Sequence, residues 1–132
     1  MCGSGGIIYV SDNEFDCLVV QGVIKRLVPH EEVCCFASSE AALVWLQSLT
    51  GKQRPRIILL DFFLPDVSGC SLAGQIRQLR GFEKIPFILL AESLSPQVQE
   101  RLAAIGNGTF VQKSMDLEKM ERDLEKMIRD LL

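Results

Sequence analysis

The chain has 132 residues, 48% hydrophobic and 23% charged; this composition suits one globular domain and excludes a disordered or fibrous chain. The 14 basic and 17 acidic residues leave a net charge of −3, which gives no long-range attraction to nucleic acid or to an anionic membrane. No apolar run approaches the roughly 20 residues that cross a bilayer, and no signal peptide is evident. We therefore expect a cytoplasmic domain that binds neither nucleic acid nor a membrane directly.

The first half of the chain predicts three strands and two helices. After a glycine-rich leader at residues 1–6, which we expect to be flexible, residues 7–10 form a short apolar strand. Residues 33–36 and 57–60 form the next two strands, and a helix over 39–49, capped by Ser38 or Ser39, lies between them. The helix over about 13–28 carries an apolar stripe of Phe15, Leu18, Val19, Gly22, Val23 and Leu27.

The second half predicts the remaining two strands and three helices. A loop leads to a helix over 72–79 that is ended by Gly81, and residues 86–90 form the fourth strand. A helix over 96–105 starts after Ser95 with proline at its first position. Residues 109–111 form the fifth strand and 117–132 a final amphipathic helix, so residues 7–132 make a single domain.

Strand and helix alternate five times with short connections. Parallel strands need crossover helices of fixed hand, so this order predicts an α/β fold: a doubly wound, parallel five-stranded sheet with helices on both faces. The strands are continuously apolar, which fits burial of both faces of the sheet.

Polar residues follow the strands at the edge where such sheets bind ligands. Ser11 and Asp12 follow the first strand, Asp61 the third, and Lys113 comes shortly after the fifth. A strand-end carboxylate such as Asp61 can act as a nucleophile toward a phosphoryl group. Asp12 and Asp61 could together hold Mg²⁺, and the Lys113 ammonium would complement a phosphoryl oxygen.

The segment LDFFLPDVSG at residues 60–69 resembles the phosphoacceptor loop of two-component response-regulator receiver domains, the CheY-like family. The likeness extends from residue 7 to about 128 and implies the flavodoxin-like strand order 2-1-3-4-5. By resemblance, Asp61 is the phosphoacceptor and Lys113 contacts the phosphoryl group. Asp12, Asp61 and the main-chain carbonyl of Phe63 match the ligands of Mg²⁺, and Phe110 matches an aromatic side chain that moves on activation.

The resemblance also implies partners and an output. A histidine kinase or a phosphotransfer protein would supply the phosphoryl group. The surface of the fourth helix, fifth strand and fifth helix would signal to an effector domain or form a homodimer. The domain would then be no enzyme beyond self-catalysed phosphoryl transfer from a donor.

Three positions depart from the family pattern. Ser11 stands at the first acidic position, Ala91 where a hydroxyl normally meets the phosphoryl group, and Ser114 where proline usually follows the lysine. Ala91 matters most, because that hydroxyl couples phosphorylation to the switch; Ser93 is a possible substitute.

These departures leave other interpretations open. The alternative to a phosphoacceptor is a phosphorylation-independent, pseudo-receiver interaction module. Phe110 is equally compatible with a packing role in the core. A hydrolase with Asp61 as nucleophile is a third option, but it lacks a substrate domain and a second acid/base pair.

The five cysteines show no spacing typical of a zinc site. We interpret them as small apolar side chains in a reducing compartment, rather than as a disulfide frame or a metal site.

Overall fold

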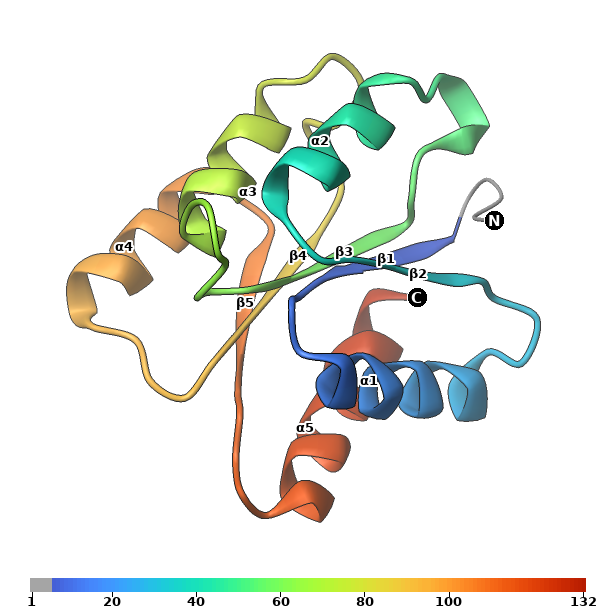
Figure 1. The fold of residues 1–132 in the computed structure, drawn as a ribbon, viewed down its shortest axis with the longest axis vertical. Helices are drawn as coiled ribbons and strands as arrows, with labels where there is room; N and C mark the ends of the chain where they lie inside the picture. Colours follow the sequence, from blue (N-terminus) through green and yellow to red (C-terminus); the bar gives the residue numbers. More distant parts are fainter. Residues whose placement is uncertain (1–5) are drawn as a thin grey trace.

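The structure, a computed structural model, describes residues 6–132 and shows strands and helices in strict alternation (Figure 1). The expected leader lies outside the described residues except for Gly6. The elements are β1 (Ile7–Val10), α1 (Glu14–Leu27), β2 (Val33–Phe36), α2 (Ser39–Gln47), the 3₁₀ turn η1 (Gly51–Gln53), β3 (Ile57–Asp61), α3 (Gly69–Arg77), β4 (Phe87–Ala91), α4 (Pro96–Ile105), β5 (Gly108–Gln112) and α5 (Leu117–Leu131).

All five strands are parallel and lie in the order β2-β1-β3-β4-β5. Helices α1 and α5 cover one face of the sheet, and α2, α3 and α4 cover the other (Figure 1). The two layers enclose separate apolar clusters, because alternate side chains of each strand point to opposite faces. The predicted doubly wound α/β fold is confirmed.

Each helix begins at a residue whose side chain accepts a hydrogen bond from the backbone N–H three residues later. This contact satisfies one of the N–H groups that a helix start leaves unpaired. The capping residues are Asn13, Ser38, Ser68, Ser95 and Asp116. The starts predicted at Ser38 and at Ser95-Pro96 are confirmed.

The apolar stripe predicted for α1 is wrong at its first turns. Phe15 and Leu18 are 56% and 66% exposed, whereas Val20, Val23 and Ile24 are buried. Apolar residues occupy more than one face of this helix, and the sheet covers only the face that carries Val20, Val23 and Ile24. The resulting exposed apolar groups lie near the carboxyl end of the sheet.

The cysteines follow the prediction only in part. Cys17, Cys35 and Cys70 are free thiols, whereas Cys34 is disulfide-bonded, so the expectation of unpaired thiols does not hold at that position.

No helix within residues 6–132 combines the length and apolar character needed to span a bilayer.

Helix α3 ends at Arg77, two residues earlier than predicted, and Arg77 joins three segments of the chain. Its guanidinium lies 4.3 Å from the centre of the Phe87 ring. All three of its nitrogens donate to main-chain carbonyls, which a planar guanidinium can do from one position. The accepting carbonyls are those of Phe82, Ile85, Ile105 and Gly106, at 2.6–3.2 Å.

We expect Arg77→Met to lower the free energy of unfolding by about 2–4 kcal/mol, because it removes the charged donor from several carbonyls and keeps only the apolar stem. Urea denaturation measures the change. The matched control is Arg80→Met, which replaces an exposed arginine on the following turn and should change the stability by less than about 0.5 kcal/mol. Equal effects of the two substitutions would contradict this role for Arg77.

Candidate functional site

Alternation along three strands brings polar side chains together on the face that α1 and α5 cover. Tyr9 and Leu59 are register partners on β1 and β3, and both belong to the cluster under α1 and α5. Asp61 is two residues beyond Leu59, so its side chain points to the same face at the carboxyl end of β3. Lys113 stands in the same relation to Val111 of β5, a member of the same cluster.

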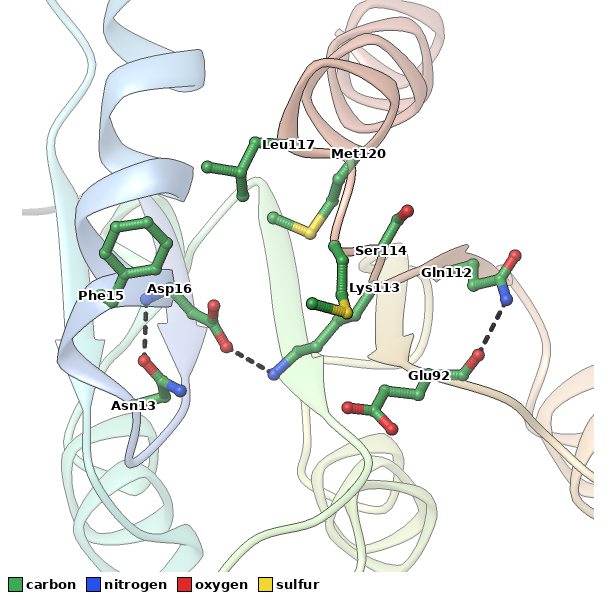
Figure 2. A pocket seen from close by; sticks show the side chains of 10 residues that line it. Asn13, Phe15, Asp16, Glu92, Gln112, Lys113, Ser114, Leu117 and Met120 are labelled. Carbon is green, nitrogen blue, oxygen red and sulfur yellow. Dashed lines mark hydrogen bonds and ion pairs between the residues drawn. The ribbon is translucent and has the colours of Figure 1, made fainter.

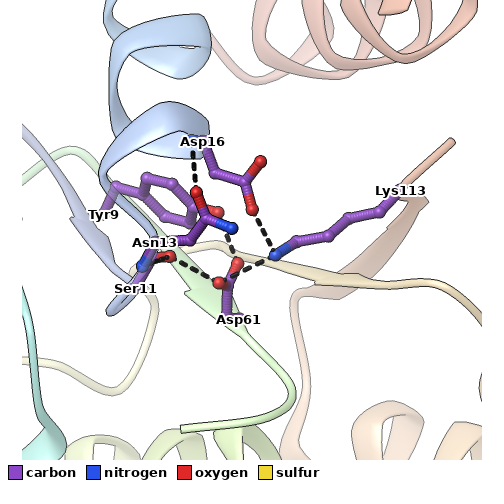
Figure 3. A network of polar contacts seen from close by, with 6 residues as sticks. All are labelled: Tyr9, Ser11, Asn13, Asp16, Asp61 and Lys113. Atoms are coloured by element: carbon purple, nitrogen blue, oxygen red, sulfur yellow. Dashed lines mark hydrogen bonds and ion pairs between the residues drawn. The ribbon is translucent and has the colours of Figure 1, made fainter. Parts of the chain in front are cut away.

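The carboxylate of Asp61 is enclosed by three donors (Figure 3). Its Oδ2 accepts from the Lys113 ammonium at 2.9 Å and from the Ser11 hydroxyl at 2.5 Å. Its Oδ1 accepts from the hydroxyl of Tyr9. The side chain is only 4% exposed, so both carboxylate oxygens are held from inside the protein.

Lys113 also pairs with a second carboxylate, that of Asp16 in the first turn of α1. The ammonium lies 2.7 Å from Asp16 Oδ2, and the two side chains are 22% and 15% exposed. Lys113 therefore bridges α1 and β3, and one cation offsets two partly or fully buried anions.

The predicted meeting of Asp12, Asp61 and Lys113 is only partly observed. Asp61 and Lys113 are in contact, but among the described residues Asp12 makes no hydrogen bond or ion pair with either. Asp12 is exposed and lines a separate surface cavity of about 400 Å³, together with Cys17 and Cys35. Ser11, the residue before it, reaches Asp61 instead.

Burial and charge shift the pKa values of these groups. Burial raises the pKa of Asp61, although hydrogen bonds from Ser11, Tyr9 and Lys113 oppose that rise. Burial by itself lowers the pKa of Lys113, but the contacts with Asp16 and Asp61 outweigh it and the pKa is raised overall. Lys113 therefore stays protonated and positively charged at neutral pH.

The mouth of the site is a surface cavity of about 720 Å³ between the start of α1 and the β5–α5 connection (Figure 2). Lys113 and Asp16 line it, but Asp61 does not. Apolar side chains border the same cavity, and two of them are strongly exposed: Phe15 at 56% and Met115 at 102%.

The strand-end carboxylate paired with a lysine, in a parallel sheet of this order, agrees with the family comparison. Residues 7–125 match the response regulator receiver domain. The chain belongs to that family.

Curated relatives agree with this assignment. The receiver is 31% identical over 90 residues to response regulator Rcp1 of Synechocystis sp., a match that covers 66% of this chain and 61% of Rcp1. It is 27% identical over 118 residues to the probable methanogenesis regulatory protein FilR2 of Methanothrix harundinacea, covering 88% of this chain and 76% of FilR2.

Solved structures share the fold. The phosphorylated cyanobacterial phytochrome response regulator RcpA has a TM-score of 0.82 at 21% identity, with 94% of this chain and 91% of that chain covered. The Mn²⁺-bound form of Rcp1 has a TM-score of 0.81 at 25% identity, with 93% and 91% covered.

The oxygen donors of this receiver suit a divalent cation in their chemistry, since Mg²⁺ prefers carboxylate, carbonyl and water oxygens. Asp12, Asp61 and the main-chain carbonyl of Phe63 are of this kind. Both oxygens of Asp61, however, accept hydrogen bonds from within the protein. A cation that binds Asp61 must therefore share the carboxylate with these donors or displace one of them.

Two of the other predicted positions, Ala91 and Phe110, lie on the opposite face of the sheet. Ala91 is buried at the end of β4, and alternation places its methyl group with Leu89 on the side of α2, α3 and α4. Phe110 is half-buried and packs against the cluster on that side. Phe63 is 75% exposed in the loop after β3.

Two contact residues, Tyr9 and Asp16, were not found from the sequence. Tyr9 is the only residue with a polar group in the apolar run of residues 7–10, and a buried tyrosine hydroxyl needs a partner, which could have signalled a polar site. Asp16 lies four residues after Asp12, but an acid in the first turn of a helix is already explained by the helix dipole.

Asp66 ties the loop after β3 to the start of α2. Its Oδ1 accepts from the Ser39 N–H at 3.2 Å, and its Oδ2 accepts from the Ser39 hydroxyl at 2.5 Å and the Glu40 N–H at 3.1 Å. These hydrogen bonds lower the pKa of Asp66 to about 2, and the one from the Ser39 hydroxyl has the largest effect. This anchor limits how far the loop that follows Asp61 can move.

The ionised Asp66 carboxylate should stabilise the receiver above about pH 4, where the carboxyl of the unfolded chain is also ionised. Because the folded pKa is lower than the unfolded one, this contribution is lost as the pH falls from about 4 to 2. We expect the stability difference between wild type and Asp66→Asn to shrink across that window in a series of urea titrations. Asp130→Asn, which removes an exposed carboxylate from α5, is the control; a difference that is constant with pH would contradict the role of Asp66.

Tyr9 should resist ionisation, because burial and the negative charge of Asp61 both raise its pKa. It is the chain's only tyrosine, so ultraviolet absorbance of the phenolate reports on it alone. We expect no phenolate signal near pH 10, where an exposed tyrosine ionises, until the protein unfolds. Since the unfolded chain loses this proton first, stability should fall as the pH rises above about 10. Reversible ionisation near pH 10 with an unchanged circular dichroism spectrum would contradict the buried hydroxyl contact.

Proposed function

We propose that this receiver accepts a phosphoryl group on Asp61, with Mg²⁺, as part of a two-component phosphorelay. The observation that supports the proposal is the 2.9 Å contact between Lys113 and Asp61 at the carboxyl end of the sheet. A carboxylate oxygen would form the new bond to phosphorus while the bond from phosphorus to the donor breaks. Lys113 and the cation would offset the charge on the phosphoryl oxygens.

The phosphoryl donor in this proposal is a histidine kinase or a phosphotransfer protein. Phe15 and Met115 are exposed apolar side chains that line the cavity at the mouth of the site. Clustered exposed apolar groups favour contact with another protein. Together with the net charge of −3, this supports a protein partner rather than a nucleic acid. In this proposal the domain acts in the cytoplasm. It is a phosphoacceptor and not an enzyme that turns over a substrate.

We propose that the output leaves through α4, β5 and α5, toward an effector domain or a second copy of the chain. Phe110 lines a surface cavity of about 490 Å³ between β5 and α5, together with charged residues of α5 such as Lys119 and Asp123. In this proposal Phe110 is the switch residue, and the Ala91 methyl group weakens its coupling to Asp61 because it offers no hydroxyl.

A phosphorylation-independent interaction module is the second candidate, and a specific observation favours it. Both Asp61 oxygens are hydrogen-bonded from within the protein, and the side chain is 4% exposed. A carboxylate held in this way is less available as a nucleophile, because its charge is already stabilised.

Incubation with acetyl phosphate and Mg²⁺ tests the proposal. We expect intact-mass measurement to show one added phosphoryl group that is stable in acid and released by base, as an acyl phosphate should be. The adduct should be absent from Asp61→Asn and present in Asp130→Asn, the matched control in α5.

The other outcomes separate the candidates. If the folded wild type acquires no adduct, the interaction module replaces the phosphoacceptor. An adduct that persists in Asp61→Asn would move the reaction to another residue.

A further inference from the structure

The Tyr9 ring is fully buried, and its hydroxyl meets Asp61 at the end of that ring. Tyr9 has an exposed fraction of 0% and packs with Ile7, Leu59 and other apolar residues under α1 and α5. Its side chain extends along the strand from the Tyr9–Leu59 register pair to Asp61, two residues farther along β3. The hydroxyl cannot turn away without moving the whole ring, so packing holds it against Oδ1.

Acceptor capacity shows what the Tyr9 contact does to the carboxylate. A carboxylate offers about four lone-pair positions. Ser11 and Lys113 occupy both lone-pair positions of Oδ2, and Tyr9 occupies one lone-pair position of Oδ1. Oδ1 is thus the oxygen with remaining capacity, and Tyr9 is the group that competes for it.

The surroundings of Oδ1 leave little room for an added ligand. The Asp61 side chain is 4% exposed, and the cavity at the mouth is lined by Lys113 and Asp16 but not by Asp61. Mg²⁺ binds oxygen at close range and in near-octahedral geometry, so an ion at the remaining lone pair of Oδ1 would lie against the Tyr9 hydroxyl and compete with it for this oxygen.

We propose that Tyr9 is a positioning residue whose hydroxyl competes with a divalent cation for Oδ1 of Asp61, and so limits how readily the site takes up metal. The effect of this competition on phosphorylation rests on the proposed function, because the cation assists phosphoryl transfer to Asp61. Ser11 differs from Tyr9 in that its hydroxyl also accepts from the Asn13 N–H at 3.1 Å, as part of the turn into α1. The small hydroxyl of Ser11 can rotate about one bond, whereas the phenol oxygen of Tyr9 is fixed by the packed ring.

The test titrates wild type and Tyr9→Phe with Mn²⁺ alone and measures free Mn²⁺ by electron paramagnetic resonance. The substitution keeps the packed ring and removes only the competing donor. We expect Tyr9→Phe to bind Mn²⁺ about tenfold more tightly. This is the gain in affinity expected when the ion no longer competes with one hydrogen bond to a charged group. The double variant Tyr9→Phe/Asp61→Asn should lose this gain, and circular dichroism checks that each variant is folded.

A second measurement needs no variant. The near-ultraviolet absorbance of the only tyrosine should shift when wild type is saturated with Mn²⁺, because the hydroxyl loses its carboxylate acceptor. Unchanged or weaker Mn²⁺ binding by folded Tyr9→Phe would overturn the inference. If that variant does not fold, an unshifted Tyr9 absorbance in saturated wild type overturns it.

Labelling with acetyl phosphate separates this inference from the proposed function. Faster labelling of Tyr9→Phe than of wild type at subsaturating Mg²⁺ supports both. Tighter Mn²⁺ binding with no adduct on either protein supports the inference and overturns the proposed function. Equal labelling with unchanged Mn²⁺ binding supports the proposed function and overturns the inference.

Discussion

The ion pair between Lys113 and Asp61 sets the arrangement around it. It connects the end of β3 to the residue that follows β5, across the intervening strand β4. Removing one partner from a buried pair of this kind typically costs about 3–5 kcal/mol, because the other charge is left without compensation. Parallel pairing and a common strand register are therefore needed not only for the core but also for placing these two charges at one edge.

Much of this arrangement could be predicted because it follows from two regular properties of sheets. Strand order and continuous apolar runs predict which residues lie at the carboxyl end, and period-two alternation predicts which of them share a face. Asp61 and Lys113 follow from these properties. The exposed face of α1 does not, because Phe15 and Leu18 are as apolar as the residues that the sheet covers, and tertiary packing selects among them.

The remaining differences are long-range side-chain contacts, which a single sequence does not encode locally. Tyr9 meets Asp61 across 52 positions, and Lys113 meets Asp16 across 97. Through these contacts the receiver supplies its own counter-charge and donors to Asp61. Ser11 fits this pattern, because a neutral hydroxyl at the first acidic position can donate to Asp61 where a carboxylate would repel it.

The chain has one tyrosine and one tryptophan, and they lie in different halves of the core. Tyr9 belongs to the cluster under α1 and α5, while Trp45 packs against the cluster under α2, α3 and α4, with its ring 5.2 Å from that of Phe36. Each half thus contains its own intrinsic chromophore. Whether the two layers melt as one cooperative unit or in separate steps can be followed optically, without attaching any dye.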